Sequence, residues 1–433
     1  ATPIIPRPMP SMSLPAASIR SVFMADARLV PPEVLSPAGD EERLRAALLY
    51  GADAVYMAGT AYGMRTAPQN FDADGLRRAT EYVHAAGKRI YITCNILPRN
   101  EDMAALPSYL QFLNDLRVDA LIVADLGLLT MAKRYAPDVP LHISTQLGVF
   151  NYETARFLHE LGAKRVVLAR ELSLREIAEI REKTPQSLEL EAFVHGAMCM
   201  SVSGRCVISD YLTGREANRG ACTQPCRWRY QIIEPHRPDK PMTVEETDEG
   251  TYLFNAQDMN MIEHVAALAR AGISSFKIEG RAKAAYYTAV TAAAYRAAVD
   301  GYAASGFSSI YVPEKWITEE LSKVSHRPYG TGFYFGKPHQ DTVSGGYVRS
   351  YAVVGVVEGY KDGMLQIAQR NRFFCGDTLD VLEPHKKPFL LPVEKLFDGD
   401  GNAIDSAPHA AMKLQIPFDR PLTVGSILRL KIE

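Results

Sequence analysis

The chain has 433 residues, of which 47% are hydrophobic and 23% are charged. This composition supplies a large core and is typical of a globular protein rather than a disordered one. The formal net charge of −2 excludes a general electrostatic attraction to nucleic acid, so any RNA contact must come from a local basic patch.

Residues 1–30 form an N-terminal extension rich in Pro, Ser and Met. They lack the positively charged start and the continuous apolar core of a signal peptide. No run of about 20 apolar residues predicts a membrane span. We therefore expect a cytoplasmic protein with no membrane partner. In that reducing compartment the six cysteines are expected to be ligands, catalysts or core residues rather than disulfides.

Short apolar runs alternate with amphipathic stretches between residues 31 and 302. Runs of this length, often β-branched and bounded by turn residues, predict buried parallel strands. We predict eight of them, at Glu33–Ala38, Ala54–Ala58, Arg89–Cys94, Ala120–Ala124, Leu141–Ser144, Arg165–Ala169, Leu188–Phe193 and Ser275–Ile278. The stretches between them have helical periodicity, and several end at a glycine. Eight strands alternating with helices predict an α/β fold, a (β/α)₈ barrel of the TIM type.

The alternation stops between the seventh and eighth strands, where we assign a cysteine-rich insertion to residues 196–254. Barrels carry their chemistry on such loops. Residues 303–346 are expected to form a connector. Residues 347–433 then show short alternating runs separated by turn signals. This pattern predicts a small C-terminal all-β barrel domain.

Four of the six cysteines lie in the insertion with the spacing C-x₆-C-x₁₅-C-x₃-C: Cys199, Cys206, Cys222 and Cys226. Thiolates are soft ligands that suit iron–sulfur clusters, zinc or copper(I). Structural zinc usually needs closely spaced cysteine pairs, and only the second pair here has that spacing. The pattern therefore favours an iron–sulfur cluster over zinc and over four unrelated cysteines. The other two cysteines are more simply core residues.

Polar side chains stand at or just past the carboxyl ends of several predicted strands, which face the catalytic side of a barrel. The substrate-binding candidates are two amides and three arginines: Asn95, Gln146, Arg65, Arg170 and Arg281. Arginine pairs with carboxylate or phosphate through two parallel hydrogen bonds. Each residue taken singly is more readily explained by a structural role, but as a set they predict a binding site.

Three further residues are candidates for catalysis. Lys277 and Glu279 alternate onto one side of the eighth strand and are expected to form a buried pair, which can equally be structural. His195 lies four residues before Cys199, where it can relay protons, although a buried core histidine is the slightly favoured alternative. A peptidase needs an activated nucleophile or a metal-bound water. Neither His-Glu-x-x-His nor Gly-x-Ser-x-Gly occurs in the chain.

The stretch around the first two cysteines resembles the signature of the peptidase U32 family. That signature has the form E-x-F-x-x-G-A-hydrophobic-C, followed by G-x-C-hydrophobic-x-S. The matching positions are Glu191, Phe193, Gly196, Cys199, Gly204, Cys206 and Ser209. Further segments that resemble the family are Leu35-Ser-Pro-Ala-Gly, Ser144-Thr-Gln, Asn218-Arg-Gly-Ala-Cys and Phe276-Lys-Ile-Glu-Gly-Arg. The resemblance therefore covers nearly the whole chain.

The length and the C-terminal domain are most similar to the branch of this family that hydroxylates tRNA. The resemblance implies hydroxylation of C5 of the wobble uridine without molecular oxygen, with the tRNA anticodon loop as partner. It also implies a [4Fe–4S] cluster on the four cysteines and prephenate, a small dicarboxylate, as co-substrate. The alternatives are a hydroxylase of another RNA or of a quinone precursor, and a collagenase-like peptidase, from which the family takes its name. The sequence does not predict the oligomeric state.

Overall fold

The computed structural model describes residues 30–63, 70–199, 206–228, 257–336, 338, 347–409 and 411–432, and the backbone of two short paired strands, β8 (Glu246–Thr247) and β9 (Gly250–Thr251). Among these residues, no helix is both long and apolar enough to cross a membrane.

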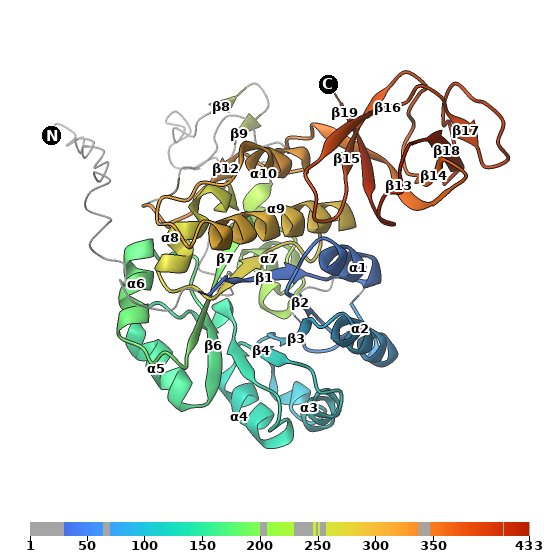
Figure 1. Ribbon diagram of the computed structural model, residues 1–433. Coiled ribbons are helices and arrows are strands. Elements are labelled where there is room, and N and C mark those ends of the chain that lie inside the picture. Colours follow the sequence, from blue (N-terminus) through green and yellow to red (C-terminus); the bar gives the residue numbers. More distant parts are fainter. Residues whose placement is uncertain are drawn as a thin grey trace, which may run out of the picture.

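Eight parallel strands form a closed barrel (Figure 1). They are β1 (Glu33–Pro37), β2 (Ala54–Met57), β3 (Arg89–Cys94), β4 (Ala120–Val123), β5 (Leu141–Ile143), β6 (Ala163–Val167), β7 (Glu189–Ala197) and β11 (Ser275–Ile278). The barrel closes because β11 pairs in parallel with both β1 and β7. Every predicted strand is present within a few residues of its expected bounds. The predicted (β/α)₈ fold is therefore confirmed.

Helices surround the strands on the outside of the barrel (Figure 1). They are α1 (Glu41–Leu49), α2 (Ala73–Ala85), α3 (Leu106–Asp115), α4 (Leu126–Tyr135), α5 (Tyr152–Glu160), α6 (Leu174–Glu182), α8 (Val265–Arg270) and α9 (Ala285–Ala304). Polar side chains cap the starts of several of them by accepting a first-turn backbone hydrogen bond, as Asp125 does for α4 and Ser173 for α6. These caps fix where each strand-to-helix turn ends, and the turns form the mouth of the barrel.

The described residues of the insertion include several that lie over the barrel mouth. The antiparallel strand β10 (Asp258–Asn260) extends the sheet beside β7, and β12 (Tyr329–Gly330) pairs with β10. The described part of the insertion contains α7 (Ile208–Thr213) and 3₁₀ turns at Ala217–Arg219 and Pro225–Arg227. Arg219 Nη1 lies 2.8 Å from the Asp102 carboxylate on the loop after β3. This hydrogen bond with Arg219 lowers the pKa of Asp102, so a charged pair ties the insertion to the barrel.

The C-terminal domain is a seven-stranded antiparallel sheet that curls into a half-barrel around its own apolar core. Its strands are β13 (Tyr351–Lys361), β14 (Met364–Gln369), β15 (Thr378–Leu382), β16 (Phe389–Pro392), β17 (Phe397–Asp398), β18 (Lys413–Pro417) and β19 (Ile427–Lys431). The edge strands β16 and β17 do not pair with each other. The predicted small all-β domain is therefore confirmed, in the form of a half-barrel.

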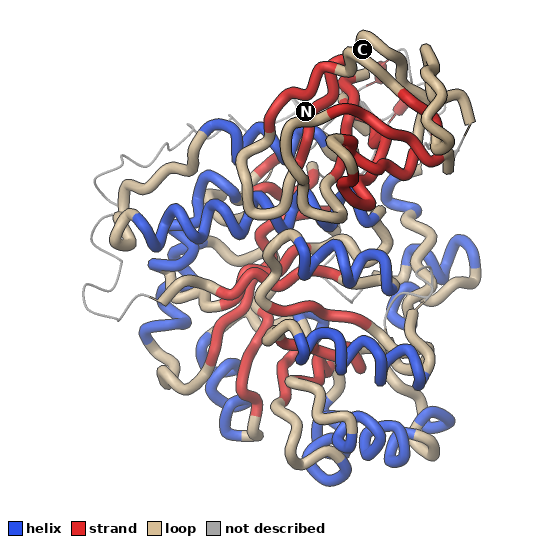
Figure 2. Tube along the Cα trace, turned by 45° about the vertical axis from the view of Figure 1, so that its right-hand side comes forward, coloured by secondary structure: helices blue, strands red, loops and turns tan. Residues whose placement is uncertain are grey.

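The C-terminal domain sits against one flank of the barrel (Figure 2). Its Arg429 is fully buried and binds Glu320, at the end of α10 (Lys315–Glu320), at 2.6 Å. From the barrel side, the Tyr50 hydroxyl donates to the carbonyl oxygens of Leu382 and Gly425, each at 3.0 Å. A buried ion pair and the hydrogen bonding of a tyrosine hydroxyl to backbone carbonyls fix the two parts to each other.

Candidate active site

A cavity of about 140 Å³ lies at the carboxyl ends of the barrel strands, under the insertion. Strand ends and the loops that follow them contribute Tyr56, Thr93, Asn95, Ser144, Gln146, Arg170, Phe193, Lys277, Glu279 and Arg281. The insertion contributes Cys199, Cys206, Ala217, Asn218, Gly220 and Cys222. The fold thus brings together four of the five predicted substrate-binding residues, two of the three predicted catalytic residues and three of the four cysteines. The fifth substrate-binding candidate, Arg65, lies outside the described residues.

Lys277 and Glu279 both face the cavity, but the predicted pair between them is wrong. Lys277 Nζ binds Glu191 at 2.7 Å, and Arg170 Nη2 binds Glu279 at 3.2 Å. The two side chains follow each other along β11, so one reaches down the barrel axis while the other stays at the mouth. Each therefore finds a partner on a neighbouring strand or loop rather than on its own strand.

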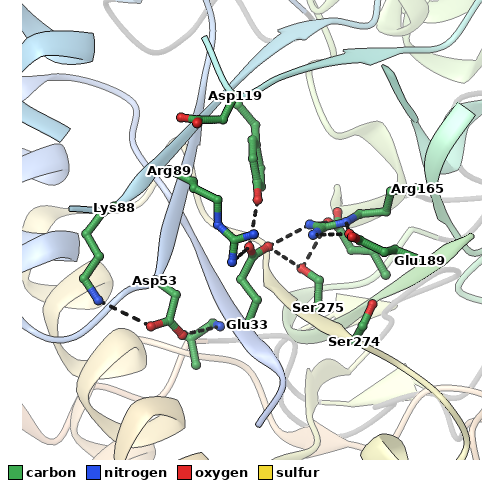
Figure 3. A network of polar contacts seen from close by, with 12 residues as sticks. Glu33, Asp53, Lys88, Arg89, Asp119, Arg165, Glu189, Ser274 and Ser275 are labelled. Atoms are coloured by element: carbon green, nitrogen blue, oxygen red, sulfur yellow. Dashed lines mark hydrogen bonds and ion pairs between the residues drawn. The ribbon is translucent and has the colours of Figure 1, made fainter. Parts of the chain in front are cut away.

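A column of buried charges runs below the cavity along the barrel axis. Glu191 is fully buried and binds Lys277, Arg165 at 2.9 Å and the Ser275 hydroxyl at 3.1 Å. Arg165 continues the column to Glu33 at 2.7 Å, as Figure 3 shows. Carboxylates and cations alternate along the column, so every buried charge has an opposite neighbour. The floor of the cavity is therefore rigid and close to neutral.

Because of this column, the free energy of unfolding of the protein depends on pH. Burial alone raises the pKa of Glu191, but the charges of Lys277 and Arg165 outweigh it and lower the pKa from 4.5 to about 2. The stabilisation of the folded state is thus fully present above pH 4.5 and is lost as the pH falls towards 2. We expect wild-type protein to lose about 3 kcal/mol over that range through this group.

Unfolding in urea at a series of pH values measures this loss. Glu191→Gln removes the titrating group and leaves two buried cations underpaired, so we expect a lower but flatter stability curve. A variant curve as steep as that of the wild type would place the acid dependence elsewhere.

His195 does not line the cavity. It is buried, 1% exposed, and lies among Tyr287, Tyr295 and Tyr329, with ring centroids 5.4 to 5.9 Å away. Burial lowers the pKa of His195 to about 3, so the ring is neutral near neutral pH. The predicted role as a proton relay at the cavity is therefore not supported by its position, and the alternative of a core histidine is.

A β-bulge in β7 explains this position. Lys277 of β11 pairs with Phe193, and the next residue, Ile278, pairs with His195. Val194 therefore has no partner in β11. An extra residue in one strand reverses the alternation of the side chains that follow it. Phe193 therefore lines the cavity, whereas His195 packs against Tyr287 and Tyr295 of α9.

Two glycines place the cavity-lining segment that ends β11. A Cβ atom on Gly39 would lie 2.1 Å from the carbonyl oxygen of Arg281, and one on Gly196 would lie 2.6 Å from that of Glu279. Only glycine permits these backbones to approach so closely. The glycines of two family-like segments thus position Glu279 and Arg281 at the cavity.

We expect Gly39→Ala to displace this segment and to lower stability by about 1–3 kcal/mol, as overpacking does. Urea unfolding measures the change. Gly359→Ala is the matched control, because a Cβ atom there meets nothing closer than 4.0 Å. Equal stability of the two variants would contradict the tight contact.

Three of the four cysteines that the sequence singles out lie on one side of the cavity. Cys199, Cys206 and Cys222 line it, and Cys226 follows on the next 3₁₀ turn. The backbone N–H of Gln224 donates to Cys222 Sγ at 3.3 Å. Within the described ranges, no three Cys, His, Asp or Glu side chains converge closely enough for a single metal ion. An all-cysteine set is the usual donor set of a four-iron cluster, which takes one thiolate at each corner.

Sequence reasoning missed two residues of this site. Asn218 lines the cavity from the insertion, and Glu191 holds Lys277 from below. Asn218 lies in a family-like segment, four residues before Cys222. This position was the signal in the sequence that could have indicated a role in the site. No pattern in the sequence indicates the pairing of Glu191, because it depends on which strands are neighbours in the closed barrel.

The fold and the site define a barrel protein with a cysteine-lined cavity at its carboxyl face. The sequence profile described as Peptidase family U32 matches residues 39–344, and that of the Peptidase family U32 C-terminal domain matches residues 349–429. The chain belongs to peptidase family U32.

Relatives in this family carry different names. The chain is similar to the tRNA hydroxylation protein P1 of Bacillus subtilis, with 36% identity over 92% of this chain and 94% of that protein. It is 37% identical to the 23S rRNA 5-hydroxycytidine C2501 synthase of Escherichia coli, over 81% of this chain and 52% of the synthase. It is also 32% identical to a collagenase of Porphyromonas gingivalis, over 70% of this chain and 74% of the collagenase.

Proposed function

We propose that this protein is an RNA hydroxylase that converts the wobble uridine of a tRNA to 5-hydroxyuridine without using molecular oxygen. The observation that carries the proposal is the cavity, where three cysteines face a set of fixed polar side chains. The names of the relatives that hydroxylate tRNA and ribosomal RNA support it.

The cysteine set suits a [4Fe–4S] cluster bound by Cys199, Cys206, Cys222 and Cys226. Such a cluster supplies one-electron redox chemistry at the cavity. The substrate base must leave its stack to reach a site beneath the insertion, and the bases of an anticodon loop are already unpaired.

The cations of the cavity suit an anionic co-substrate such as the dicarboxylate prephenate. Arg170 is held by the carbonyl oxygen of Ala197 at 2.8 Å and by Glu279, with its guanidinium 3.8 Å from the centre of the Phe193 ring. Arg281 Nη1 donates to Thr93 Oγ1 at 3.2 Å. Arginines oriented before binding favour pairing with carboxylates, and Arg281 is the one that we assign to the co-substrate.

A peptidase is the second candidate, because a relative is named as a collagenase. The described residues favour it less. The histidine nearest in sequence to Cys199 is buried outside the cavity, so it is not placed to activate that thiol. No described cluster of His, Cys, Asp or Glu holds a single metal ion that could activate water.

Mass spectrometry of tRNA nucleosides tests the proposal. Cells that lack the gene are expected to lose 5-hydroxyuridine and its derivatives, and the wild-type gene is expected to restore them. Unchanged nucleosides in the deletion strain would reject the proposal. Cleavage of denatured collagen by the purified protein, without any effect on tRNA, would favour the peptidase.

A further inference from the structure

Three buried polar atoms in the wall of the cavity have no hydrogen-bond partner: Gln146 Nε2, Arg170 Nε and Asn218 Oδ1. They come from the 3₁₀ turn after β5, the loop after β6 and the insertion. Buried polar atoms are almost always paired, because an unpaired one loses its hydration without compensation. Three such atoms around one cavity indicate the hydrogen-bonding groups of the ligand that belongs there.

The orientation of the Gln146 amide is fixed by its neighbours. Its Oε1 accepts from Asn95 Nδ2 at 2.7 Å and from Ser144 Oγ at 3.3 Å, and the side chain is 5% exposed. Because the oxygen is occupied, the amide presents its NH₂ group as the unpaired donor. Asn95 and Ser144 are therefore positioning residues for Gln146.

The other two groups complete a pattern of two donors and one acceptor. Each terminal nitrogen of Arg170 has a partner, the carbonyl oxygen of Ala197 or Glu279, whereas the donor Nε has none. Asn218 Oδ1 can only accept. A ligand that satisfies all three atoms must present two acceptors and one donor.

We propose that these three residues read the edge of the substrate base, a uracil. Gln146 and Arg170 donate to its two carbonyl oxygens, O4 and O2, and Asn218 Oδ1 accepts from N3–H. This inference rests on the proposed function and names the residues that select its substrate. The carboxylates of a dicarboxylate offer acceptors alone, so they match the two donors but not the Asn218 oxygen. Cytosine places a lone pair at N3, where uracil has a hydrogen.

Binding of RNA hairpins by the full-length protein, isolated without oxygen, tests this assignment. The hairpins share an anticodon-type loop and differ only in the target base, which is uracil, cytosine or 3-methyluracil. Fluorescence anisotropy gives the dissociation constants. The wild type is expected to prefer uracil by about tenfold or more, because a site built to hydrogen-bond a group rejects analogues that lack it.

The variants remove one reading group each. Asn218→Ala is expected to abolish most of the preference for uracil over cytosine and to admit 3-methyluracil, since the acceptor and its bulk are gone. Gln146→Glu exchanges a donor for an acceptor of the same size, and about tenfold weaker binding of the uracil hairpin is expected. The matched control is Gln111→Glu on the exposed face of α3, which is expected to behave as the wild type. Urea unfolding checks that each variant is folded.

The outcomes separate this inference from the proposed function. If the wild type binds none of the hairpins, the proposed function fails. If it binds them and both variants retain the wild-type ratio of uracil to cytosine affinity, the reading by these residues is overturned and the function stands. If Gln146→Glu changes only the affinity for prephenate, the site belongs to the co-substrate and the inference is also overturned. If Gln146→Glu does not fold, Asn218→Ala decides alone, because Asn218 is only partly buried on a 3₁₀ turn.

Discussion

Arg165→Ala is expected to destabilise the barrel by about 3–5 kcal/mol, the largest effect on stability that we predict. Arg165 is 2% exposed and contacts three carboxylates, those of Glu33, Glu189 and Glu191, at 2.6 to 2.9 Å. Removal of the guanidinium leaves the buried carboxylates of Glu33 and Glu191 with one cation each, Arg89 and Lys277. Losing one partner of a buried pair costs far more than the pair contributes, because the remaining charge stays out of water.

Urea unfolding followed by tryptophan fluorescence measures this effect. Both tryptophans, Trp228 and Trp316, precede the C-terminal domain, so the signal reports on the barrel side of the molecule. Arg156→Ala is the matched control, since Arg156 is half exposed and makes only a 3.4 Å pair with Glu153 on the surface. The control is expected to change stability by less than about 0.5 kcal/mol. An Arg165→Ala curve that overlays the control would contradict the role of the column.

The column also shows why the fold was easier to predict than the contacts inside it. Buried parallel strands leave continuous apolar runs, and eight such runs with helices between them suffice to indicate a barrel. Which side chains meet across the barrel axis depends on strand register and closure. Lys277 was therefore placed on the correct side of its strand but given the wrong partner, Glu279 in place of Glu191.

In the site, too, sequence patterns predicted some features, whereas others depend on details of the three-dimensional structure. Polar residues at strand ends, such as Asn95, Gln146 and Arg170, were predicted because a barrel directs those ends to one face. His195 was misplaced because a bulge of a single residue leaves no mark in a sequence pattern. Asn218 was missed because the insertion has no periodic secondary structure from which to infer the direction of a side chain. The close spacing of the cysteines predicted that they lie together, and three of them line the cavity.

Cys222→Ala is expected to abolish RNA hydroxylation, with a loss of at least about 100-fold, and to remove iron and sulfide from the purified protein. Cys222 lines the cavity, and the Gln224 N–H donates to its sulfur, as suits a thiolate ligand. Anaerobic purification followed by iron, sulfide and zinc analysis measures the cofactor, and nucleoside mass spectrometry measures the activity. Zinc in the wild type, without iron or sulfide, would contradict the cluster.

Two measurements together distinguish a ligand from a nucleophile. If Cys222 binds a cluster, both the iron content and the activity depend on it, so the Cys222→Ala variant loses both. A nucleophilic cysteine carries the activity alone, and its removal leaves any bound metal in place. Cys375→Ala is the control, because Cys375 is exposed in the C-terminal domain and its thiol donates to the carbonyl oxygen of Glu394 at 3.2 Å. Retained iron in an inactive Cys222→Ala protein would favour the peptidase, whereas joint loss, with both retained in the control, assigns this cysteine to the cluster.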